Sequence, residues 1–119
     1  MSADTWIQVF YPIPAGYMPV ADAVAHSLQK WRGLTSESLR MHGLTKPPIT
    51  VDGKTCALCQ VFLWGPDPRT CDGCPLTEVL GHSCDEDERE REAPWWDWAY
   101  HRNPRPMIRA LERALENQK

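Results

Sequence analysis

Five cysteines are the residues of this chain whose type and spacing could do chemistry, and all of them lie between residues 55 and 84. Cys56 and Cys59 form one C-x-x-C pair, and Cys71 and Cys74 form a second pair after eleven intervening residues. Two such turns bring four thiolates to one point, which matches the tetrahedral coordination of Zn²⁺ with Zn–S distances of about 2.3 Å. The spacing therefore predicts a structural zinc site formed by these four cysteines.

A second ligand set stays open because the region holds further donors. Pro75 is suited to begin a short helix that Gly81 would end, and Cys84 or His82 could then return to replace one of the four cysteines. The main alternative exchanges Cys84 for a member of the second pair. The first pair belongs to every set.

Other chemistries fit the cysteines less well. Structural disulfides are rare in a reducing cytosol, and five cysteines leave one over. A Cys-Pro step also ends ferredoxin-type runs, but those runs contain C-x-x-C-x-x-C, which is missing here. A catalytic zinc keeps an open position, and deaminase-type sites add an H-x-E or C-x-E tripeptide near the first ligand, but no such tripeptide precedes a cysteine pair here. A metal-dependent enzyme or redox protein is therefore the third hypothesis, and we expect no catalysis.

Length and charge narrow the class of protein. The chain has 119 residues, which suits one domain, and its formal net charge is −3 with a pI near 5.8. Such a balance does not attract the chain to a nucleic-acid backbone or an anionic membrane. No basic segment precedes an apolar one at the N-terminus, and no apolar run approaches the ~20 residues of a membrane span. These features predict a cytoplasmic protein.

The elements that must position the cysteines read as a small α+β domain. A strand with alternating side chains is predicted over 5–11, within an N-terminal strand and Pro-rich loop at 1–19. A helical pair follows at 20–44, with Val20, Val24, Leu28 and Trp31 on one face of the first helix. Residues 49–84 form a β-hairpin, with its turn at Asp52-Gly53, that leads into the metal lobe. Residues 85–93 are an acidic segment, and 94–119 hold an aromatic segment and an amphipathic helix that packs back on the first one.

The aromatic segment is the best candidate for binding a partner. Exposed aromatic rings beside arginines can stack on a base or anchor a protein interface. Residues 93–119 carry five basic and three acidic residues, which suits one anionic ligand. The competing interpretation packs all four aromatic side chains into the core. The predicted contact residues are Trp95, Trp96, Trp98, Tyr100, Arg102 and Arg105.

Four stretches together resemble a known group of proteins: "LQKWRGLTSESLRMHGL", "CALC", "CDGCPL" and "PRPMIRALERAL". The arrangement is similar to small, mostly uncharacterised cysteine-rich proteins of bacteriophages and prophages. The resemblance implies an accessory protein in a bacterial host cytoplasm, with cysteines as zinc ligands. It favours a non-enzymatic role that inhibits or sequesters a host component, either a protein or a small anionic or nucleotide ligand, including one of antiviral defence. The alternative is a zinc-finger-like nucleic-acid-binding module, although only Lys54 and Arg69 lie near the cysteines.

Overall fold

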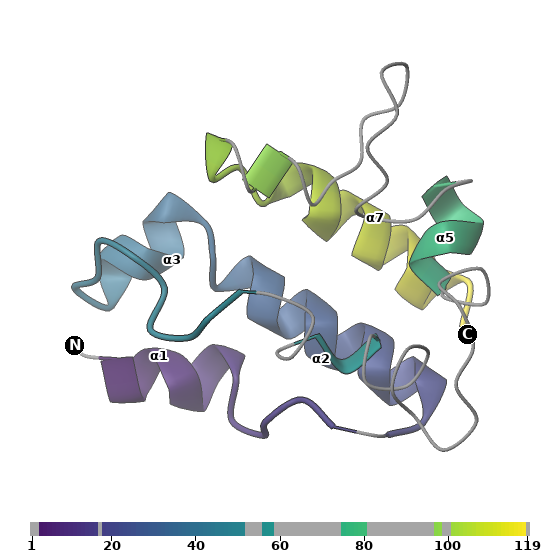
Figure 1. Ribbon diagram of the computed structural model, residues 1–119, viewed down its shortest axis with the longest axis horizontal. Helices are drawn as coiled ribbons and strands as arrows, with labels where there is room; N and C mark the ends of the chain where they lie inside the picture. The colour runs from purple at the N-terminus through teal and green to yellow at the C-terminus, as the bar shows by residue number, and fades with distance from the viewer. Residues whose placement is uncertain are drawn as a thin grey trace.

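The structure of the protein is a computed structural model that describes residues 3–16, 18–51, 56–58, 75–80, 97–98 and 101–118. Throughout these ranges the regular structure is helical, and none of the described residues forms a strand. The predicted α+β class is therefore wrong for this part of the chain. The helices shown in Figure 1 are α1 (Ala3–Phe10), α2 (Val20–Arg32), α3 (Ser36–Met41), α5 (Pro75–Leu80) and α7 (Arg105–Glu116).

Helix α1 replaces the predicted N-terminal strand. Trp6 and Phe10 are four residues apart and share one face of the helix, with their ring centroids 5.6 Å apart, whereas Val9 is 48% exposed. Trp6 is fully buried, and its indole Nε1 donates a hydrogen bond of 2.7 Å to the carbonyl oxygen of Gly33. In a strand, side chains alternate, so Gln8 would lie on the same side as the rings of Trp6 and Phe10. The helix keeps the two rings on one face and turns Gln8 away from them.

Helix α2 lies at the centre of the molecule and confirms the predicted helix of residues 20–33 (Figure 1). It begins after Pro19 and ends at Gly33, whose N–H donates to the Lys30 carbonyl at 3.0 Å. Helix α1 runs along one side of α2, where Gln29 Nε2 donates to the carbonyl oxygen of Val9 at 2.6 Å. Helix α2 therefore packs against the N-terminal helix α1, and the C-terminal helix α7 packs on it as well.

Helix α3 follows α2 after a short turn and confirms the second helix of the predicted pair. Thr35 is its N-cap, because the Thr35 hydroxyl oxygen accepts a hydrogen bond from the Ser38 N–H at 3.1 Å. The helix ends at Met41, and Gly43 then takes the left-handed conformation with φ of 71°. His42, between them, lies 3.0 Å from the Thr5 hydroxyl and so ties α3 to α1.

The predicted hairpin of residues 49–58 is also wrong where the structure describes it. Residues 49–51 form no strand, and residues 57–58 are helical. Ile49 and Val51 pack singly against the core, while Ala57 and Leu58 are buried in it. A two-residue turn motif favours a reversal of the chain direction, but it does not by itself make the flanking residues pair as strands. In this chain, packing of the flanking residues against the core decides their conformation. The Asp52-Gly53 turn itself lies outside the described residues.

Helix α7 packs back on α2, as predicted (Figure 1). Its buried side chains are Met107, Ala110, Leu111 and Ala114. Arg32 of α2 and Glu112 of α7 form an exposed ion pair of 3.4 Å at the edge of this interface. Helix α5 begins at the buried Pro75 and contacts α7. The second cysteine pair, which ends at Cys74, is therefore followed directly by an element docked on the helical core.

No helix among the described residues has the length and apolar character needed to cross a membrane.

Candidate functional site

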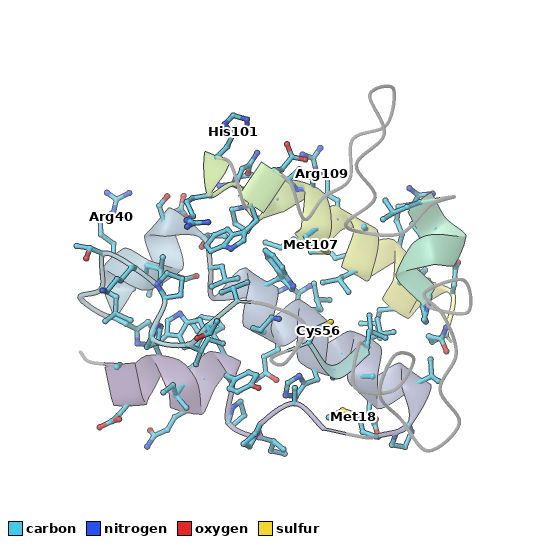
Figure 2. The ribbon with its side chains drawn as sticks, viewed as in Figure 1. Met18, Arg40, Cys56, His101, Met107 and Arg109 are labelled. Carbon is cyan, nitrogen blue, oxygen red and sulfur yellow. The ribbon has the colours of Figure 1, made fainter. Side chains whose placement is uncertain are left out.

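Cys56 is the predicted zinc ligand that the structure describes. It is half-buried and packs against the hydrophobic core, and Figure 2 shows it over the middle of α2. Its Sγ lies 4.0 Å from the hydroxyl oxygen of Ser27 on α2. The two residues that follow it, Ala57 and Leu58, have at most 1% of their surface exposed. The first three residues of the C-x-x-C motif, residues 56–58, therefore lie against or within the core.

Ser27 and Lys30 are residues that the sequence interpretation missed. They are the buried polar side chains of the described residues, each only 1% exposed. Both lie on α2, three residues apart and hence on neighbouring positions of one face. The signal that points to them is a serine and a lysine placed within the apolar stripe of a helix whose other buried residues are Ala23, Val24, Leu28 and Trp31.

The remaining predicted ligands, Cys59, Cys71, Cys74, Cys84 and His82, lie outside the described residues. Among the residues that are described, no three His, Cys, Asp or Glu side chains come together as a metal site. The donor chemistry nevertheless fits zinc at Cys56, because a thiolate is a soft ligand and the Ser27 hydroxyl beside it can donate to its sulfur. The acidic segment of residues 85–93 also lies outside the described part of the chain.

Trp98 is the side chain of the aromatic cluster that the structure describes, and it lies in the core. Trp98 is 4% exposed, and its ring meets that of Trp31 edge to face, with centroids 5.6 Å apart. Of the predicted contact residues, Trp98 is therefore not on the surface. Trp95, Trp96 and Tyr100 lie outside the described residues.

Arg102 and Arg105 are both exposed. Arg102 has a φ of 53°, and it is the non-glycine residue with positive φ in the described chain. Its N–H donates to the carbonyl oxygen of Trp98 at 2.8 Å, which closes the turn before α7. A side chain in this left-handed conformation costs about 1 kcal/mol or more, and glycine avoids that cost. An arginine therefore occupies a backbone position that glycine would fill without strain.

The Arg102 guanidinium is held above the buried ring of Trp98. Its Cζ lies 5.3 Å from the ring centroid, and its NH1 donates to the Trp98 carbonyl oxygen at 3.2 Å. A cation stacked in this way keeps its charge at the surface while its stem is fixed. Trp98 thus joins the core on one side and supports a charged group on the other.

Further cations continue from Arg102 along the outer side of α7. Arg105 and Arg109 are four residues apart on the helix, and both are exposed. Figure 2 shows His101 and Arg109 on the side of α7 that faces away from α2. We call the set formed by His101, Arg102, Arg105 and Arg109 the basic edge. Its three arginines gather positive charge in a chain whose formal net charge is −3.

A separate groove of about 370 Å³ lies between α1 and α2, beside the end of α7. Residues 25 and 29 of its wall lie on the opposite side of α2 from Ser27, because an α-helix has 3.6 residues per turn. The groove is therefore distinct from both Cys56 and the basic edge. Its lining residues are Val9, Phe10, Ala25, Leu28, Gln29, Arg32 and Leu115.

Comparisons with family models, with curated proteins and with solved structures return no match to this chain.

Proposed function

We propose that this chain is a non-enzymatic, zinc-stabilised accessory protein that sequesters an anionic component of a bacterial host. The basic edge makes the contact, and the cysteine segment supplies a structural zinc. The phage-type setting comes from the sequence resemblance. The binding role is supported by the cations at the start of α7.

The observation that carries the proposal is the arginine in the left-handed turn. Arg102 holds a φ of 53° while its guanidinium stacks on Trp98. Stability alone favours glycine there, so an arginine at this position points to a use for its charge. Arg105 and Arg109 extend the same positive edge, and a fixed guanidinium binds phosphate or carboxylate oxygens through paired N–H groups.

Zinc has a folding role in this proposal. Cys56 packs against α2, and Pro75, directly after the second cysteine pair, is buried and starts a helix that contacts α7. Four thiolates that close the intervening segment around one ion would contribute folding free energy directly. The site would hold the segment on the core without taking part in a reaction.

Native mass spectrometry of the protein recovered from bacterial lysate tests this function. One spectrum reports the bound metal, any small molecule that copurifies and any captured protein. We expect one zinc per chain and an additional bound component, which is lost in an Arg102→Gly, Arg105→Ala variant. Glycine accepts the left-handed turn, so this variant should stay within about 1 kcal/mol of the parent stability.

The matched control is Arg40→Ala, which removes an exposed arginine on α3, a different element from those that carry the basic edge (Figure 2). This control should keep the bound component. Equal retention by the parent, the double variant and the control would contradict the basic edge as the contact surface. A parent protein that carries zinc but never a second component would contradict the sequestering role.

A further inference from the structure

The groove between α1 and α2 has the size and the mixed lining of a small-molecule site. Its volume of about 370 Å³ falls within the range of about 300–1,000 Å³ that such sites occupy. Most of its lining is apolar, and it includes Val9 of α1, a side chain that is 48% exposed. Among the described residues that line the groove, Arg32 carries the only charge. The groove thus combines an apolar surface with one cation.

The wall that α2 contributes to the groove changes character along the helix. Ala25 and Leu28 are apolar, and Gln29 and Arg32 follow them in the last turn. These four positions share one face of the helix and extend over about 10 Å of its axis. An elongated ligand can therefore lie along α2, with an apolar part beside Ala25 and Leu28 and a polar end beside Arg32.

The polar end of the groove offers hydrogen-bond donors. Arg32 has several N–H groups, and its ion pair with Glu112 is a single contact of 3.4 Å between two half-exposed side chains. Gln29 donates one amide N–H to the Val9 carbonyl oxygen at 2.6 Å, and its amide has a second N–H. An exposed pair held by one contact is weak, so a ligand carboxylate can share the guanidinium with Glu112 or displace it.

We infer that this groove binds a small amphiphilic carboxylate. Its aliphatic or aromatic part lies on the apolar lining, and its carboxylate accepts hydrogen bonds from Arg32 and Gln29. The charge selects an anion, because the described lining holds a cation and no acidic side chain. A carboxylate is the anion that a guanidinium binds through two parallel N–H groups. This site is separate from Cys56 and from the basic edge, so its failure would leave the proposed function untouched.

The test is isothermal titration calorimetry of the full chain with octanoate, and with octanol as a neutral probe of the same chain length. We expect one octanoate per chain, bound about fivefold more tightly than octanol, which is the upper limit for a solvent-exposed charge pair. Arg32→Gln should weaken octanoate binding about fivefold and abolish the preference for octanoate. The matched control is Arg109→Gln, which removes an exposed arginine of α7 and should leave both affinities unchanged.

Two further substitutions separate recognition from a merely structural role of Arg32. Arg32→Gln and Glu112→Gln both remove the ion pair, so a structural role moves octanoate affinity in the same direction in both variants. Recognition predicts opposite directions, because Glu112→Gln removes a competing carboxylate and should tighten octanoate binding about twofold. Ala25→Phe places a ring at an exposed position of the groove wall, so it should weaken both probes about tenfold and leave the helical circular dichroism unchanged.

Each outcome supports or overturns the inference. Equal affinity of the parent for octanoate and octanol, unchanged in Arg32→Gln, would contradict recognition of a carboxylate. No binding of either probe would overturn the site itself. A groove covered by a second copy of this chain would give a concentration-dependent dimer that Ala25→Phe converts to monomer, without octanoate binding, and this result would also overturn the inference. Should Ala25→Phe fail to fold, the directions of the Arg32→Gln and Glu112→Gln effects decide.

Discussion

Replacing Gly33 by alanine tests how α1 packs against the end of α2. Helix α1 is the element that the sequence analysis predicted to be a strand. Gly33 has φ of −74° and ψ of −12°, which any residue can adopt, so its backbone does not require glycine. The obstacle is space. A Cβ atom at this position would lie 2.5 Å from Cγ, 2.7 Å from Cβ and 2.7 Å from Cδ2 of Phe10.

The expected magnitude follows from two opposing terms. A Gly→Ala change at a compatible backbone position stabilises by about 0.4–1 kcal/mol, whereas forcing an extra carbon into a packed contact costs about 1–3 kcal/mol. The three atoms belong to the root of the Phe10 side chain, which cannot swing away without moving α1. We therefore expect Gly33→Ala to lower the free energy of unfolding by about 2 kcal/mol, or Tm by roughly 8 °C.

The assay is urea unfolding followed by circular dichroism, with Gly16→Ala as the matched control. A Cβ at Gly16 would have no atom within 4 Å, so this change should be neutral or stabilising by about 0.5 kcal/mol. In a Phe10→Ala background, which removes two of the three close atoms, Gly33→Ala should cost at least about 1 kcal/mol less. A Gly33→Ala variant more stable than its parent would refute the docking of α1 at this position.

Three further predictions concern the core, a helix cap and the metal. Trp98→Ala should lower the free energy of unfolding by about 3–5 kcal/mol, because Trp98 is buried against Trp31, and a loss below about 1 kcal/mol in urea unfolding would contradict this burial. Thr35→Ala should cost about 1 kcal/mol through loss of the α3 cap, Thr35→Ser should cost much less, and equal losses for the two would argue against the cap. Removal of zinc by a chelator should lower Tm while part of the helical circular dichroism remains, and an unchanged thermal transition would contradict a structural site.

Local signals predicted α2, α3 and α7, but not α1. The periodic apolar face of 20–33, the capping threonine before α3 and the amphipathic pattern of 104–118 all act within one or two helical turns. The residues 5–11 satisfy two patterns at once, because aromatic and β-branched side chains occur at both strand and helix spacing. The contact between Trp6 and Gly33, 27 residues away, selects the helix, and no local pattern contains it.

The candidate site was predicted only in part for the same reason. Cysteine spacing identifies a metal hypothesis, but it cannot reveal that Ser27 lies beside Cys56, since these residues are 29 positions apart. The aromatic segment suggested an exposed surface, whereas packing against Trp31 buries Trp98. The left-handed conformation of Arg102 carries no sequence signal, because glycine and asparagine are the residues that announce it.

The central position of α2 has a consequence for the order in which the chain assembles. The described contacts of α1 and α3 join residues 37 positions apart or fewer, whereas the Arg32–Glu112 pair that links α2 to α7 spans 80 positions. Contacts between near residues form sooner, and synthesis adds only about 5–20 residues each second. The N-terminal helices can therefore dock before the last cysteine has been made. Until α7 has been synthesised, the face of α2 that it packs on stays uncovered, so the incomplete chain is the form most prone to aggregate.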